Sequence, residues 1–212
     1  VRHWGALVHF EALRASAESV LRPHLHGDFS LNVTNSITAA ELFERGLDTL
    51  TPSYDLDRAQ LEALLAQADP SRFTLTLFHR IPTFHTEHCV YSHLLSNGRD
   101  HRTCGRPCEK HEVALRDHTQ RSHPVIVDVG CRNTVFNSEA QSCARLVPTL
   151  IARGVRRFRV EFVRESRAEA AQTLRAFSAL LAARISADEA LRLCGAKAHL
   201  GVSSAPMALM QR

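Results

Sequence analysis

The segments FHTEHCVYSHLLSNGRDHRTCGRPCEKH (residues 84–111) and VIVDVGCRNTVFN (residues 125–137) decide how this chain is interpreted. They interrupt an otherwise regular alternation of strand and helix patterns, and they carry four of the chain's six cysteines. These four are Cys89, Cys104, Cys108 and Cys131. Thiolates in such a number are typical ligands of an iron–sulfur cluster or of zinc. The sequence therefore predicts a cofactor or metal site formed by these four residues.

The spacing within the segment supports this interpretation. Cys104 and Cys108 bracket Gly105 and Pro107, which favour a tight turn that would direct both sulfur atoms to one side. The alternative is four unrelated buried thiols, since free cysteine packs as a small apolar residue. Three of the four lie in a polar segment that offers no core to bury them, so we favour the metal site.

The rest of the chain alternates strand and helix. The apolar runs predict strands at 28–33, 47–52, 73–79, 124–129 and 155–163. Capping and periodicity predict helices over 37–45 and 57–67, and further helices that begin after Ser138, Ser166 and Ser186. For the first helix we expect a capping box of Thr38 and Glu41 and an end at Gly46. The helix that follows Ser138 is expected to run to Gly154.

This alternation predicts an α/β fold with a parallel sheet. Repeating units of this length suit a TIM-like (β/α) barrel, of which 212 residues can form only a part. We therefore expect one domain over residues 1–212, the C-terminal portion of a barrel, with a Cys/His-rich insertion at about 83–122. The chain begins at Val1 in the middle of a βα pattern, so an N-terminal truncation is also expected. A flavodoxin-like open sheet is the alternative fold.

Polar residues follow each predicted strand, and in barrel enzymes the functional residues occupy such strand ends. Arg132 and Asn133 follow the strand that leads to Cys131, and Glu161 lies near the end of the last strand. We take these three as the candidate substrate-side residues, because we expect them to leave adjacent strand ends beside Cys131. Arginine can also bind a carboxylate through two parallel hydrogen bonds. The alternative for each is ordinary loop solvation or helix capping.

Histidines cluster around the same segment. His85 and His88 flank Glu87 beside Cys89, a set that could suit zinc or a hydrolytic site. The spacing is not the H-E-x-x-H of zinc metalloproteases. No G-x-S-x-G, P-loop or G-x-G-x-x-G pattern occurs in the sequence.

Composition narrows the class of protein. The net charge of +4 is mild and does not require a nucleic-acid partner. No run of 18 apolar residues is present, so no membrane span is expected. Six cysteines in a chain of this size do not suggest a disulfide scaffold, and a reducing cytoplasm suits them better.

The cysteine segment and its continuation to residue 137 resemble peptidase family U32, the collagenase-like proteases. The resemblance extends to DFSLNVTN, LTPSYDL and RFRVEFV, and so covers most of residues 28–165. It implies a TIM-barrel-like core, and it places Cys89, Cys104, Cys108 and Cys131 at the family's cysteine-bearing positions. Ser92 stands where some relatives carry a further cysteine.

The resemblance implies two different activities. The family name implies peptide hydrolysis, whereas several relatives hold a [4Fe–4S] cluster on four cysteines and support hydroxylation of RNA bases or of ubiquinone precursors. Some of those relatives use prephenate as oxygen donor. The expected cofactor is therefore a [4Fe–4S] cluster, with zinc as the alternative. The expected partners are a small-molecule oxygen donor, an RNA or quinone precursor, and a partner subunit.

Overall fold

The computed structural model describes residues 1–16 and 23–200, which form a mixed α/β fold. The α-helices of these residues are α1 (Trp4–Ser16), α2 (Ser36–Glu44), α3 (Arg58–Gln67), α4 (Val90–Leu95), α5 (Val147–Ala152), α6 (Arg167–Leu181) and α7 (Ala187–Cys194). Their strands are β1 (His26–Gly27), β2 (Thr49–Leu50), β3 (Thr74–His79), β4 (Pro82–Thr86), β5 (Val113–Arg116), β6 (Ser122–Val127), β7 (Asn133–Phe136), β8 (Gln141–Ser142), β9 (Arg157–Val160) and β10 (Lys197–Ala198).

The core strands run mainly parallel, as the sequence predicts. β1 pairs with β2, a parallel bridge from Leu50 to Phe73 continues toward β3, and β3 pairs with β9. β8 is the exception: it runs antiparallel to the end of β3 and carries β10 on its other side. The strands of the described residues form three separate sheets, and no closed barrel is found among them. The α/β class is thus confirmed.

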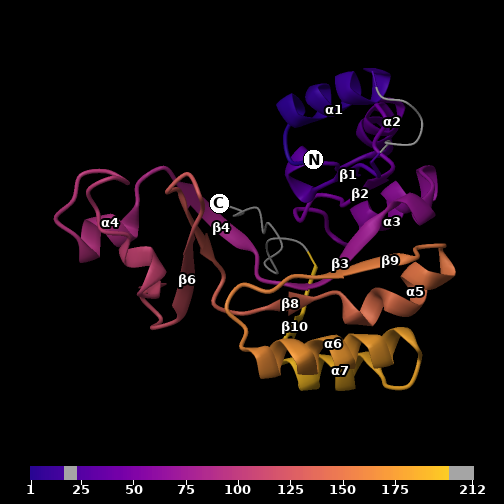
Figure 1. Cartoon of the computed structure of the whole chain (residues 1–212). Helices are drawn as coiled ribbons and strands as arrows, with labels where there is room; N and C mark the ends of the chain where they lie inside the picture. Colours follow the sequence, from indigo (N-terminus) through magenta and orange to yellow (C-terminus); the bar gives the residue numbers. More distant parts are fainter. Residues whose placement is uncertain (17–22, 201–212) are drawn as a thin grey trace, which may run out of the picture.

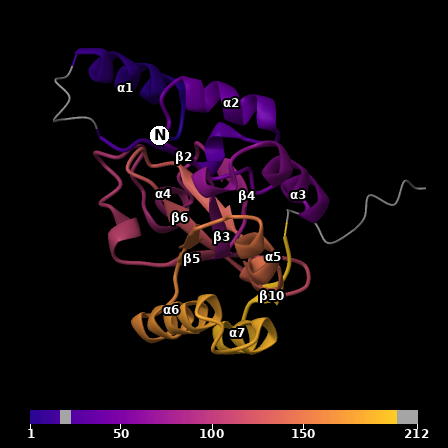
Figure 2. The same ribbon diagram turned by 90° about the vertical axis from the view of Figure 1, so that its right-hand side faces the viewer.

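Helices flank the core strands. Figures 1 and 2 both place α1 and α2 at one end of the molecule and α6 and α7 at the opposite end, with the strands between them. The strands contribute apolar side chains to one continuous core, which includes Leu50, Phe73, Leu75 and Leu77. Burial of such side chains is the main stabilising contribution to the fold.

Some predicted elements are wrong in their bounds. Only β1 forms near the predicted strand 28–33, because the Asp28 side chain accepts a hydrogen bond from the Phe29 N–H (2.9 Å) and starts a 3₁₀ turn. The predicted helix from 138 to 154 is instead β8, a 3₁₀ turn and the short α5, in which Pro148 occupies the first turn. Proline is well tolerated there, since its missing N–H would have no partner inside the helix.

The predicted helix caps are confirmed for two helices and corrected for a third. Ser166 and Ser186 cap α6 and α7 as predicted. Helix α2 is capped by Asn35 and not by Thr38. Gly46, which follows the helix as predicted, has φ +92°. A side-chain oxygen at such a cap satisfies an N–H that has no partner within the helix.

The cysteine-rich segment forms a lobe of its own, which Figure 1 shows extending from the core beside β3. We call residues 81–137 the Cys lobe. Its sheet has the order β4-β7-β6-β5, and all three pairings are antiparallel. The predicted strand 124–129 is therefore β6 of this lobe and not a strand of the parallel core. The antiparallel sheet of this lobe continues beyond residue 122, the expected end of the insertion, because both β6 and β7 belong to it.

No helix in the described part of the chain has both the length and the apolar character needed to cross a membrane.

Candidate functional site

The four predicted cysteines gather in the Cys lobe. Cys89, Cys104 and Cys131 line one cavity of about 330 Å³. Cys108 is not in that lining, but it packs with Cys89 against the small apolar core of the lobe. All four thiols are half-buried and free. Residues at the start of α4, in the loop after it and in the β6–β7 turn are thus brought to one place. That the four cysteines form one metal or cofactor site stays a prediction.

The Cys108 thiol lies close enough to the Cys89 and Cys104 thiols for their charges to affect its pKa. Burial raises the pKa of the Cys108 thiol, and the proximity of the Cys89 and Cys104 thiols raises it further. Negative charges that accumulate on neighbouring thiolates repel one another, and a bound cation removes that cost. Four thiols are the donor set that a thiolate-bound metal or cluster requires. In the described residues, no three His, Cys, Asp or Glu side chains meet as the ligands of one single ion.

Local backbone geometry positions Cys89 and Cys104. The Cys89 Sγ accepts a hydrogen bond from the Ser92 N–H (3.5 Å) and so caps α4. Gly98 lies directly against the backbone of Cys104, since a Cβ atom there would approach the Cys104 Cα to 2.4 Å. Only glycine lets the loop after α4 fold so closely over the second cysteine.

Cys131 reaches the cavity through an unusual turn. It has φ +62°, in the left-handed region, and its N–H donates to the Asp128 carbonyl (3.0 Å). Such a conformation is uncommon for a residue with a side chain and costs energy. The β6–β7 turn therefore holds the thiol in a position that a regular strand would not give it.

Asn133 connects two of the cysteine-bearing segments. It is fully buried, with 0% of its surface exposed. Its Nδ2 donates to the Cys131 carbonyl (3.1 Å), and its Oδ1 accepts from the Val90 N–H (3.1 Å) next to Cys89. Sequence reasoning identified Asn133 as a substrate-side residue. The geometry gives it the contacts of a positioning residue, because both ends of its amide are occupied by the chain itself.

Arg132 and Glu161 lie in different parts of the molecule. The half-exposed Arg132 pairs with Asp128 in the same turn, with 2.8 Å between Nη2 and Oδ2. Glu161 follows β9 in the core and pairs with Arg159, with 2.6 Å between Oε1 and Nη2. The expectation that both leave adjacent strands is wrong, because β6 and β7 belong to the sheet of the Cys lobe. Their roles in substrate binding stay predictions.

The surroundings of Glu161 form a polar face that the prediction covered only in part. Arg159 Nη1 also pairs with the buried Asp28 (2.7 Å), and His26 contacts Thr49 (2.8 Å) across the neighbouring strands. We call Glu161 and these four side chains the polar face of the core. An open cavity of about 750 Å³ beside β1, β2, β3 and β9 is lined by His26, Asp28, Thr49 and Arg159. The signal was present in RRFRVEFV, where alternate positions are charged, as in a strand with one polar face.

Tyr54 follows β2 in the chain and lies close to Glu161 and Arg159 of the polar face. Its ring stacks on Phe29 with 4.3 Å between the ring centroids. Burial and the nearby Glu161 carboxylate raise the pKa of Tyr54, so its hydroxyl remains protonated in the neutral range. Tyr54 can therefore act there as a hydrogen-bond donor.

His79, at the end of β3, is buried beside Tyr54, and the two rings meet edge to face at 4.3 Å. The His79 Nε2 lies 3.2 Å from the Gln141 Nε2, so the ring accepts there and carries its proton on Nδ1. Nδ1 is buried and has no hydrogen-bond partner among residues 1–16 and 23–200. Burial, with the charge of Arg159, lowers the pKa of His79 to about 4.

This histidine predicts a pH dependence of stability. The unfolded chain binds the proton near pH 6.5, whereas folded His79 does so only near pH 4, so stability falls as the pH drops through that window. From pH 7 to pH 5 we expect His79 to remove about 2 kcal/mol from the free energy of unfolding. Denaturant unfolding at both pH values should show a smaller loss, by about that amount, in His79→Gln. An equal loss in both proteins would contradict the assignment.

A comparison of the sequence with protein-family models gives a match over almost the whole chain. The family model described as peptidase family U32 matches residues 9–199, which includes the core, the Cys lobe and all four clustered cysteines. No curated protein and no solved structure matched the chain. The family match covers far more than half of the chain and agrees with the resemblance seen in the cysteine segment. The chain belongs to peptidase family U32.

Proposed function

We propose that this U32 protein is an enzyme that depends on an Fe–S cluster, with Cys89, Cys104, Cys108 and Cys131 as the cluster ligands. The observation that carries the proposal is the convergence of these thiols, three of which line one cavity while the fourth packs beside them. When bound, such a cluster supplies one-electron redox chemistry, which side chains alone do not offer.

The small core of the Cys lobe supports a bound cofactor. Only Tyr91, Val125 and Val135 form its fully buried apolar cluster among the described residues. A lobe of this size rarely reaches stability from so few buried side chains, and a metal or cluster is a common stabilising element. The same observation favours a second candidate function, in which the cluster or a zinc ion is purely structural.

The polar face of the core is the proposed substrate side. The parallel order of β1, β2, β3 and β9 supports a partial (β/α) barrel, whose inner surface this face would form. Arg159 and Glu161 offer charge to a polar substrate, and Tyr54 offers a hydrogen bond. Arg132, beside Cys131, would attract an anionic oxygen donor in exchange for its pair with Asp128. A hydroxylation of an RNA base or a quinone precursor is the reaction class we favour.

A peptidase would need an activated nucleophile, and an arrangement of His123, Asp117 and Ser138 that resembles a triad does not provide it. His123 Nε2 lies 3.1 Å from the Asp117 carboxylate. The other ring nitrogen, however, accepts from the backbone N–H of Ser138 (3.2 Å), while the Ser138 hydroxyl donates to Asn137. A base that activates serine must contact its hydroxyl, and here it does not.

Anaerobic purification followed by metal analysis tests the proposal. We expect about four iron and four sulfide per chain, with a broad charge-transfer absorption that bleaches on reduction. Stoichiometric zinc without iron would instead support a structural metal. Cleavage of gelatin by metal-free protein, lost on substitution of His85 or Glu87, would overturn the proposal in favour of a hydrolase.

A further inference from the structure

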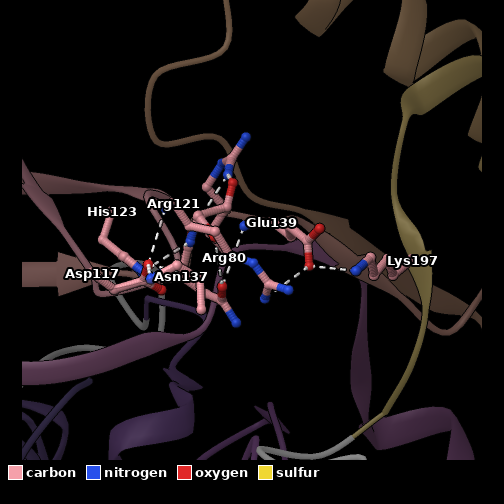
Figure 3. A network of polar contacts seen from close by, with 9 residues as sticks. Arg80, Asp117, Arg121, His123, Asn137, Glu139 and Lys197 are labelled. Atoms are coloured by element: carbon pink, nitrogen blue, oxygen red, sulfur yellow. Dashed lines mark hydrogen bonds and ion pairs between the residues drawn. The ribbon is translucent and has the colours of Figure 1, made fainter.

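The junction between the core and the Cys lobe contains a polar network, which Figure 3 shows from close by. The chain leaves the core at Arg80 and returns at Asn137 and Ser138. Arg80 donates to the carbonyls of both returning residues and pairs through Nε with Glu165 (2.9 Å). One arginine thus holds the outgoing and the returning segments together.

Beside this junction lies a cavity of about 400 Å³ that neither the cysteines nor the polar face of the core contributes to. Arg121, from the β5–β6 turn, lines it from the Cys lobe, and Lys197 and His199 line it from β10 and the residue after that strand. Asn137, Glu139 and Gln141 complete the polar part of its wall. Both lobes therefore contribute to one polar space that is open to solvent, since the side chains of Arg121 and Lys197 are 57% and 62% exposed.

The charges of this cavity are unbalanced. Glu139 is the only acid in its lining, and it faces two cations. Its Oε2 lies 2.6 Å from the Lys197 Nζ and 4.0 Å from the Arg121 Nη1. In Figure 3 the side chains of Arg121 and Lys197 approach Glu139 from opposite sides. The carboxylate of Glu139 occupies the position that an external anion would take between the same two cations.

A further group in the cavity lacks a partner. The Nε2 of His199 is buried, and it has no hydrogen-bond partner in the described parts of the chain. A buried polar atom without a partner is costly, and such atoms are often satisfied by a ligand or water. The Nε2 atom is itself buried and does not open onto the cavity, so the side chains that an oxyanion there would contact are Lys197 and Arg121.

We propose that this cavity is a binding site for a small oxyanion, a carboxylate or a phosphate group, which bridges the core and the Cys lobe. The site is independent of the proposed cluster. Lys197 and Arg121 are its cationic contacts, one from each side of the junction, and Glu139 competes with the ligand for both. Binding would therefore stiffen the attachment of the lobe that carries the cysteines.

Calorimetric titration of the full chain with sodium phosphate and with malonate, at ionic strength held constant with chloride, tests the site. We expect saturable binding of at least one of the two, weakened about tenfold or more by Lys197→Gln and by Arg121→Gln. A preference for phosphate or for malonate identifies the ligand's charged group. Because the measurement needs no iron and no turnover, its failure is separate from failure of the proposed enzyme.

Glu139→Gln gives the sharpest outcome, because removal of the competing carboxylate should tighten binding by about three- to tenfold. A general loss of fold cannot produce that gain. Arg145→Gln is the matched control, since Arg145 pairs with Asp188 on the surface and lies outside the cavity lining. Absence of saturable binding, or Lys197→Gln and Glu139→Gln proteins that bind as the parent does, would overturn the proposal.

Discussion

A Cys104→Ser/Cys108→Ser variant is expected to retain less than about a tenth of the iron of the parent protein after anaerobic purification, because hydroxyl groups are poor ligands for a cluster. Cys131→Ser should lose iron to a similar extent. The Cys131→Ser variant is the most informative, because Cys131 is brought to the cavity by the β6–β7 turn. Cys104 and Cys108, in contrast, are already close to each other in the sequence. Iron and sulfide per chain, with the absorption spectrum, provide the measurement.

The two remaining cysteines lie outside the Cys lobe, and one of them provides a matched control. Burial raises the pKa of Cys143 to about 12, and its Sγ donates to the Thr76 carbonyl (3.3 Å) in the core. Cys194 lies at the end of α7, with its Sγ 3.6 Å from the Leu191 carbonyl. Cys194→Ala should keep its iron. Full iron content in Cys131→Ser, or equal losses in Cys194→Ala, would show that the ligand set is wrong.

The local features of the fold were predictable because neighbouring residues determine them. The serine caps of α6 and α7 and the glycine after α2 need only a few residues of context, and all three are confirmed. Strand β3 is likewise found almost at its predicted bounds. Such elements depend on backbone hydrogen bonds within one turn or on one apolar run.

Strand partners were harder to predict. PVIVDV is equally suitable for a buried parallel strand and for the centre of an antiparallel sheet, and β6 proves to be the latter. That error placed Arg132 and Asn133 in the parallel core beside Glu161, whereas the structure puts them in a different sheet. Pairing depends on residues distant in sequence, about which the pattern of a single strand carries no information.

The candidate site shows the same division. The four cysteines were singled out by residue type and spacing, and three of them line one cavity while Cys108 packs with Cys89 on the lobe's apolar core. That they hold one cofactor stays a prediction. The polar face around Arg159 was signalled by alternating charges in one strand, but its partner Asp28 comes from a segment 131 residues away. The junction cavity had no signal in the sequence, because Arg121, Glu139 and Lys197 meet only in the folded chain.

Asn133→Ala is expected to separate the two halves of the cysteine site. Loss of the amide leaves the part-buried Val90 N–H and Cys131 carbonyl without the partners they have now. The cost should be about 2–3 kcal/mol in the free energy of unfolding, since each lost partner of a buried group costs about 1–3 kcal/mol and the two losses overlap. The β6–β7 turn would also lose its connection to α4, and with it the position of the Cys131 thiol.

Two measurements distinguish positioning from general stability. Denaturant unfolding gives the change in free energy, and the rate at which a chelator removes iron from the folded protein reports on the cysteines directly. We expect iron release to become about ten- to a hundredfold faster, the range found when an outer partner of a metal ligand is lost. Asn97→Ala makes the same chemical change at an exposed position of the same lobe and should alter neither value. If Asn133→Ala unfolds and releases iron as Asn97→Ala does, Asn133 does not hold the site together, and the substrate-side role predicted from the sequence becomes the better explanation of this buried amide.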